Sequence, residues 1–112
     1  MEIQIESHSE DVTLVTLIGK LDLMGAQAID TRLGATANRG AHVVVDLQGV
    51  TFLASMGIRS LVMAAKAAQL KGRRLVVAKA SADVEQVLLA SGLDSLIPIT
   101  ASIEEAVALC QS

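Results

Sequence analysis

Residues 43–61 read VVVDLQGVTFLASMGIRSL, and this stretch decides the fold. The three consecutive valines at its start are typical of a strand that is covered on both faces of a sheet. Asp46 and Gly49 then interrupt the apolar run, which predicts a strand end and a turn. After Ser55 the apolar residues recur with the period of a helix. The stretch therefore predicts a strand, a bend and a helix start, with the Ser55 hydroxyl placed where unpaired backbone amides point outward.

The composition favours a single domain over residues 1–112. Hydrophobic residues make up 52% of the chain and Phe52 is the only aromatic residue, so the core must be aliphatic. The net charge of -3 disfavours binding to phosphate backbones or to anionic membranes. Interleaved basic and aromatic residues, which stack on single-stranded nucleic acid, are absent. We therefore expect no nucleic-acid partner and no direct membrane binding.

Targeting, disulfide and metal signals are missing from the sequence. No apolar run approaches the roughly 20 residues that a membrane span needs, and the acidic N-terminus does not resemble a signal peptide. Cys110 is the sole cysteine, which excludes an intramolecular disulfide and fits a reducing compartment. His8 and His42 lack the spacing of metal ligands. We expect a cytoplasmic protein without a metal or other cofactor.

Hydrophobic periodicity outlines the remaining elements. Polar residues 7–11 are expected to turn the chain, and residues 19–22 to end the second strand. Pro98 places the last strand at a sheet edge, and Ser102 with Glu105 forms a capping box that opens the last helix. The expected strands are 2–6, 12–18, 43–47, 75–78 and 96–99, and the expected helices are 24–37, 55–71, 81–90 and the segment that follows Ser102.

The element order is β-β-α-β-α-β-α-β-α. Alternating strands and helices predict an α/β domain in which most neighbouring strands are parallel. We expect a five-stranded sheet with an antiparallel hairpin strand at its N-terminal edge and four helices. The sequence contains no linker, repeat or low-complexity segment that would indicate a second domain.

Two segments resemble the STAS domains that act as anti-sigma factor antagonists. They are Gly19-x-Leu21-Asp22 and Val45-Asp46-Leu47-x-x-Val50-x-Phe52-Leu53-Ala54-Ser55-x-Gly57-Ile58. The likeness covers essentially the whole chain and includes the element order. It implies the STAS-type βα superhelix, in which the strands lie side by side in chain order.

The resemblance implies a bacterial phosphorylation switch in transcription rather than an enzyme. In that family the unphosphorylated domain binds an anti-sigma factor that is also a serine/threonine kinase, and so frees the sigma factor. The kinase phosphorylates the serine that corresponds to Ser55, which releases the antagonist, and a PP2C-type phosphatase resets it. The family often has an aspartate before this serine, whereas this chain has Ala54, which bears on kinase specificity. Asp22, beside the site by the same resemblance, would repel a phosphate.

The second helix gives an independent indication of a partner surface. At about 100° per residue, Met56, Ser60, Met63 and Ala67 form a stripe. We expect it to lie opposite the core stripe, which comprises Ile58, Leu61, Val62, Ala65 and Ala68. Outward methionines suit adaptable protein contacts, although isolated exposed apolar residues are also normal. The expected partner-binding residues are Asp22, Met24, Ala54, Met56, Gly57, Arg59, Ser60, Met63 and Ala67.

Purely structural interpretations exist for several of these residues. Ser55 is a preferred N-cap type and would then only cap the helix. Gly57, in the first helical turn, allows either close approach of a kinase or tight packing against the strand bend. Asp46 is expected to form structural hydrogen bonds, and Cys110 to be a small buried hydrophobe.

Two other function classes stay open. STAS-like domains also resemble accessory parts of transport systems and stress-sensing assemblies that lack phosphorylation control. A serine enzyme would use Ser55 as its nucleophile, but residues 53–57 lack the first glycine of a nucleophile elbow. No glycine-rich phosphate loop with its lysine is present either. We therefore expect no catalytic residue.

Overall fold

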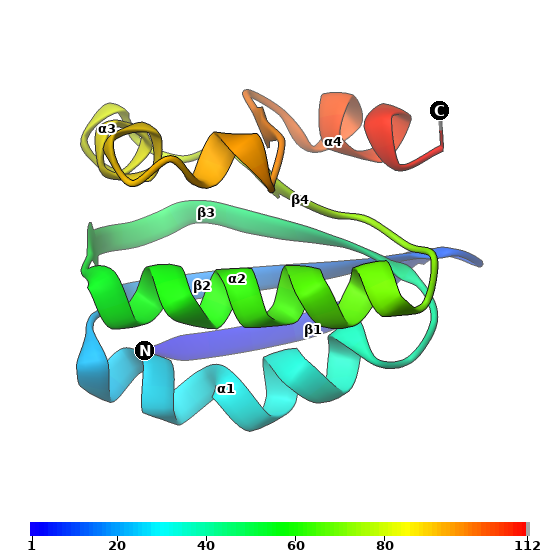
Figure 1. The fold of residues 1–112 in the computed structure, drawn as a ribbon, viewed down its shortest axis with the longest axis horizontal. Helices are drawn as coiled ribbons and strands as arrows, with labels where there is room; N and C mark the ends of the chain where they lie inside the picture. Colours follow the sequence, from blue (N-terminus) through cyan, green and yellow to red (C-terminus); the bar gives the residue numbers. More distant parts are fainter. Residues whose placement is uncertain (112) are drawn as a thin grey trace.

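A computed structural model of the protein describes residues 1–111. Its elements follow the expected order with one added turn of 3-10 helix (Figure 1). They are β1 (Glu2–Ser9), β2 (Val12–Leu21), α1 (Leu23–Ala37), β3 (His42–Leu53), α2 (Ser55–Leu70), β4 (Leu75–Ala78), α3 (Ala82–Ala90), η1 (Leu93–Ser95), β5 (Ile99–Thr100) and α4 (Ile103–Cys110).

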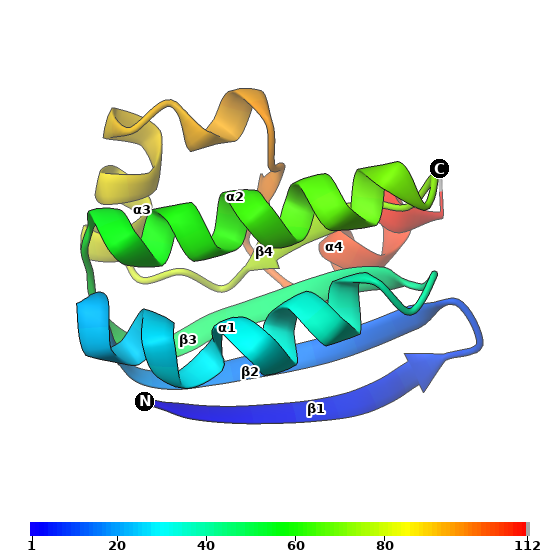
Figure 2. The same ribbon diagram turned by 60° about the horizontal axis from the view of Figure 1, so that its bottom comes forward.

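The five strands form one sheet in the order β1-β2-β3-β4-β5. β1 pairs with β2 antiparallel, and the other neighbours pair parallel. This confirms the predicted α/β fold, with its N-terminal hairpin strand and its strands side by side in chain order. In two views α1 and α2 lie next to each other on one face of the sheet, and α4 lies on the opposite face (Figures 1 and 2).

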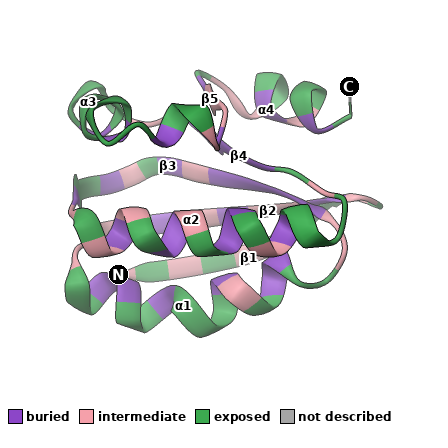
Figure 3. Ribbon diagram, in the orientation of Figure 1, coloured by how far each residue is buried: buried purple, intermediate pink, exposed green. Residues whose placement is uncertain are grey.

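The core is divided between the two faces of the central strands. In β3, Val43 and Val45 pack into the cluster beneath α1, α2 and α3, whereas Val44 packs into the cluster beneath α4. All four residues of β4 are buried (Figure 3). The run of valines is therefore covered on both faces, as its sequence predicts.

The ends of the central strands differ from the prediction. Asp46 and Gly49 do not end β3, because Gly49 stays paired with Ile18 and the pairing with β2 continues to Leu53. β2 likewise continues to Leu21, with register irregularities on both sides of Gly19, which has φ +116°. The pattern 43–53 is therefore one long irregular strand, and the turn follows Leu53. The Asp46 carboxylate accepts a hydrogen bond from the Gln48 backbone at 2.9 Å, which confirms its structural role.

Smaller corrections concern the hairpin and the C-terminal third. β1 extends to Ser9, so only residues 10 and 11 form the turn. β5 covers Ile99–Thr100 rather than 96–99, because η1 and the Pro98 ring precede it. The helical spacing of residues 81–90 also predicts that Val87 points inward, but Val87 is 37% exposed. Half of the predicted capping box is present: the Ser102 hydroxyl accepts from the Glu105 backbone at 3.1 Å, whereas the Glu105 carboxylate accepts from the Ala101 backbone at 3.3 Å rather than from Ser102.

Candidate functional site at the start of the second helix

Two helices begin side by side where β2 and β3 end. β2 leads into α1 through Asp22, and β3 leads into α2 through Ala54. The Ala54 backbone N–H donates to the Leu21 carbonyl at 3.0 Å, which ties the two connections together. Both helix starts therefore lie at one edge of the sheet, where carboxyl ends of parallel strands commonly form ligand and partner sites (Figures 1 and 2).

Ser55 is the first residue of α2, and it is exposed. Ala54 occupies the N-cap position in an extended conformation, and no side chain caps the helix. The interpretation of Ser55 as the N-cap is therefore wrong. Within residues 1–111 the Ser55 hydroxyl has no hydrogen-bond partner. The site presents a free alcohol beside the unpaired N–H groups of a helix start.

Gly57 lets the first turn of α2 lie directly on the end of β2. It is buried, and a Cβ placed on it would meet the Leu21 carbonyl oxygen, the Leu21 Cγ at 2.6 Å and the Leu53 Cδ1 at 3.0 Å. Gly25 has the same role in α1, because its Cβ would meet the Lys20 carbonyl. The geometry thus favours tight packing as the reason for Gly57, the second of the two interpretations.

Asp22 is the N-cap of α1. Its carboxylate accepts a hydrogen bond from the Gly25 backbone at 2.8 Å. It immediately follows Leu21, whose carbonyl accepts the Ala54 N–H, so Asp22 lies one residue from the point where β2 contacts the start of α2. The capping bond gives Asp22 a structural role of its own.

Exposed apolar side chains come from the same two connections. Met24 is 78% exposed, and Leu23 and Phe52 are each 51% exposed. The sequence interpretation included Met24 but missed Leu23 and Phe52. The signal for Phe52 was available: it precedes the buried Leu53 in an extended segment, and alternate residues of a strand point to opposite faces.

The stripe on α2 lies differently from the prediction. Ser60 is buried, and its hydroxyl donates to the Met56 carbonyl at 3.2 Å. Met63 is 59% exposed, whereas Met56 and Ala67 are partly buried. Conversely, two predicted core residues, Ile58 and Val62, are only partly buried. The stripe faces α1 rather than solvent, because α1 packs beside α2 on the same face of the sheet.

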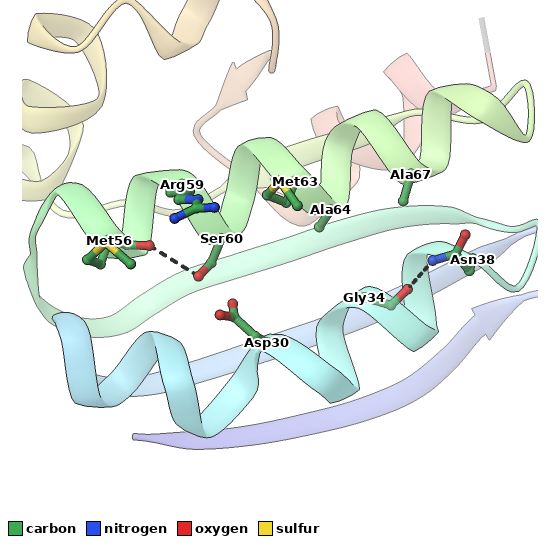
Figure 4. Close-up of a pocket in the computed structure, with 9 residues that line it drawn as sticks. All are labelled: Asp30, Gly34, Asn38, Met56, Arg59, Ser60, Met63, Ala64 and Ala67. Atoms are coloured by element: carbon green, nitrogen blue, oxygen red, sulfur yellow. Dashed lines mark hydrogen bonds between the residues drawn. The ribbon is translucent and has the colours of Figure 1, made fainter.

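A groove of about 420 Å³ runs between α1 and α2 (Figure 4). The Met56 and Met63 side chains and small residues give it an apolar lining, and Asp30 and Arg59 provide one charge of each sign. Its lining consists of Asp30, Gly34, Asn38, Met56, Arg59, Ser60, Met63, Ala64 and Ala67. Five of the residues predicted to bind a partner thus line one concave surface, and Met56 at its end follows Ser55 directly on α2.

Comparison with known families identifies the domain. The family model for the STAS domain matches residues 3–106. The chain belongs to the STAS domain family. The predicted relationship is therefore confirmed, and the match covers nearly all of the five strands and half of α4.

Solved structures share this STAS fold at low sequence identity. An anti-sigma factor antagonist from Mycobacterium paratuberculosis superposes with a TM-score of 0.88 at 23% identity, over 99% of this chain and 94% of that one. The Bacillus cell fate determinant SpoIIAA in its phosphorylated form superposes with a TM-score of 0.72 at 20% identity, over 96% of this chain and 97% of that one. The murine Slc26a9 anion transporter superposes with a TM-score of 0.76 at 21% identity, over 90% of this chain but only 18% of that one.

The histidines of this STAS domain lie at the end of the sheet opposite Ser55. His42 begins β3 opposite Val12, and His8 is in the adjoining hairpin. His42 is buried, and its Nδ1 accepts a hydrogen bond from the Arg74 backbone at 3.0 Å. Burial and the Arg73 guanidinium lower the pKa of His42. Neither imidazole is placed to activate the Ser55 hydroxyl, so the geometry does not favour a serine nucleophile.

Residues 1–111 show neither a cluster of metal ligands nor a membrane-spanning helix. No group of three or more His, Cys, Asp or Glu side chains in this range is arranged to hold a metal ion. Among the helices of the same range, none is long and apolar enough to span a bilayer. Cys110 is buried against the second face of the sheet, and burial raises the pKa of its thiol.

Proposed function

We propose that this STAS domain is an anti-sigma factor antagonist that is switched by phosphorylation of Ser55. The observation that carries the proposal is the exposed, unpartnered Ser55 hydroxyl on the first turn of α2, bordered by exposed apolar side chains. An unpaired alcohol at this position is accessible to a kinase. In the proposed reaction its oxygen attacks the γ-phosphorus of ATP, the bond to ADP breaks, and a base of the kinase takes the proton.

A phosphate at Ser55 is compatible with the fold. It would lie at the positive end of α2, where helix N–H groups stabilise anions. Its effect must then be on the partner, because a phosphoserine adds about 1.5–2 negative charges at neutral pH. Burying that charge against an apolar or acidic surface without a counter-ion costs several kcal/mol, and each ~1.4 kcal/mol weakens binding tenfold.

The proposed partner surface consists of the two helix starts and the α1–α2 groove. Met24, Leu23 and Phe52 supply exposed apolar area, and Met63 continues it along α2. Gly57 and Ser60 are buried, so they act by letting the elements approach rather than by touching a partner. The other proposed contacts are Asp22, Ala54, Met56, Arg59 and Ala67.

The proposed partners are an anti-sigma factor serine/threonine kinase and a PP2C-type phosphatase. We propose that the domain meets both of them in the cytoplasm. Two forms of the structural neighbour SpoIIAA, unphosphorylated and phosphorylated, support a phosphorylation cycle on this fold. We propose no catalytic activity for the domain itself. The family often has an aspartate where this chain has Ala54. The active site of the proposed kinase would therefore have to accept a small apolar residue directly before Ser55.

The test is phosphorylation followed by affinity measurement. The domain is incubated with candidate serine kinases of its host and ATP, and mass analysis locates the modified residue. Ser81, an exposed serine that caps α3 through the Val84 backbone, provides a matched control as Ser81→Ala. We expect Ser55→Ala to bind the kinase persistently without modification, and Ser55→Asp to bind weakly. Equal affinity of wild type, Ser55→Ala and Ser55→Asp for the kinase contradicts the proposal.

The second candidate is an interaction subunit of a transport complex without phosphorylation control. The likeness to a segment of the Slc26a9 anion transporter favours it, since that segment has the same fold. Affinity purification separates the candidates: a membrane transport protein that binds wild type and Ser55→Asp equally supports the second, and a soluble kinase that binds only the wild type supports the first.

A further inference from the structure

Arg59 follows Ser55 by four residues on α2, and both side chains are exposed. Residues four apart on a helix are neighbours, with Cβ atoms about 5–6 Å apart. Within residues 1–111 the Arg59 guanidinium has no hydrogen-bond or salt-bridge partner. The one cation that reaches Ser55 along its own helix is therefore free to bind a new anion.

Arg59 also lines the groove between α1 and α2, across from Asp30 (Figure 4). These two residues carry the formal charges of the groove lining, and the remaining lining residues are neutral. The cation of the groove and the cation nearest Ser55 along α2 are thus the same side chain. Anything that binds the guanidinium near Ser55 changes the charge balance inside the groove.

We propose, resting on the function proposed above, that a phosphate on Ser55 captures Arg59 and so withdraws the positive charge from the α1–α2 groove. The guanidinium is planar and donates two parallel hydrogen bonds to phosphate oxygens, a geometry that lysine lacks. In the unmodified protein Arg59 is available to a carboxylate of the partner. After modification such a carboxylate meets Asp30 and a phosphate whose counter-ion is already bound within the domain. Phosphorylation then acts by competition for one arginine as well as by added charge.

Other charged groups near the start of α2 could also act on a phosphate at Ser55. Lys20 is exposed in β2 opposite Phe52, and it is the second cation within reach of this edge. Asp22 caps α1 at the same end of the sheet, and its carboxylate would oppose a phosphate there. Lys66 is exposed on α2 eleven residues beyond Ser55, about 16 Å along the axis, which exceeds the Debye length of about 10 Å at 0.1 M salt. These residues make Lys20→Gln and Lys66→Gln informative controls.

The experiment uses the full chain with phosphoserine installed at position 55 during synthesis, so that no kinase is needed. Titration by ³¹P NMR then gives the second pKa of the phosphate, which is ordinarily about 6. We expect Arg59→Gln to raise this pKa by roughly 0.2–0.7 units, the size of an exposed ion pair. Arg59→Lys should give an intermediate value, and Lys66→Gln should match the wild type.

A second readout follows the groove. Phosphorylation should shift the Met63 methyl resonance in the wild type, and Arg59→Gln should remove most of that shift. Equal phosphate pKa values in wild type and Arg59→Gln, or a larger change in Lys20→Gln than in Arg59→Gln, would overturn the inference. This titration tests only the pairing of Arg59 with the phosphate, because no partner is present. If the proposed function fails, phosphorylation leaves the affinity for the partner unchanged, and the titration is not affected by that result.

Discussion

Replacing Gly57 by alanine should separate the first turn of α2 from the end of β2. The added methyl group would meet the Leu21 carbonyl oxygen, lie 2.6 Å from the Leu21 Cγ and lie 3.0 Å from the Leu53 Cδ1. Leu21 and Leu53 are buried core residues. The backbone oxygen is a particularly poor neighbour, because Leu21 is paired with Leu53 of β3 and its oxygen already accepts the Ala54 N–H, so it can move little.

The magnitude follows from two opposing effects. Inserting a methyl group into a closely packed site costs about 1–3 kcal/mol, and alanine is favoured over glycine in a helix by up to about 1 kcal/mol. We therefore expect the free energy of unfolding of Gly57→Ala to fall by roughly 1–2 kcal/mol. The shift of α2 would also strain the Ala54–Leu21 hydrogen bond, which is 3.0 Å long in the structure.

Gly34→Ala is the matched control. Gly34 is within α1, and a Cβ placed on it would have no atom within 4 Å apart from its chain neighbours and the backbone of its own helix. Only the helix-propensity difference between glycine and alanine remains there, so the free energy of unfolding of this variant should rise by about 0.5–1 kcal/mol. Urea unfolding followed by far-ultraviolet circular dichroism suits a chain that has no tryptophan or tyrosine. A Gly57→Ala midpoint equal to or above that of Gly34→Ala, at similar m-values, would refute the packing argument.

Three further predictions concern single side chains. Asp22→Ala removes the 2.8 Å cap to the Gly25 backbone and should cost about 1 kcal/mol in urea unfolding, with Asp22→Asn retaining most of the stability; an unchanged alanine variant would show that the cap is dispensable. Burial and the Arg73 guanidinium lower the pKa of His42 in the folded state. The unfolded chain then binds the proton more tightly, so stability should decrease as the pH falls below about 6.5, and His42→Gln should flatten that decrease. Burial raises the pKa of the Cys110 thiol, so a thiol reagent at pH 8 should react slowly with the native protein and quickly above the urea midpoint; equal rates would contradict the burial of this residue.

The site itself was predictable in part. Ser55 as an exposed residue at a helix start follows from the change of period after Ser55, together with the family resemblance. The absence of a side-chain cap on α2 was not predictable, because serine at such a position usually is the cap. The identity of the N-cap depends on where β3 ends, and that end is set by pairing with β2 rather than by the residues of β3 alone.

Local sequence alone was enough to predict the order of the elements, the two-sided burial of the valines in β3 and the Ser102 N-cap of α4. These features depend on residue types within one turn or a few positions of a strand, so local spacing is enough to reveal them. The longer of the two family segments is likewise continuous, and the resemblance points to Ser55 without knowledge of any distant neighbour.

Only the tertiary structure decided the length of β3 and which side of α2 is buried. Gly49 stays in the strand because β2 offers it a partner, and Ser60 is buried because α1 packs against its side of α2. Both outcomes depend on elements that are distant in sequence, and a helical wheel drawn for α2 alone contains no information about a second helix beside it. For the same reason the groove, and the position of Arg59 between it and Ser55, emerge only when the chain is folded.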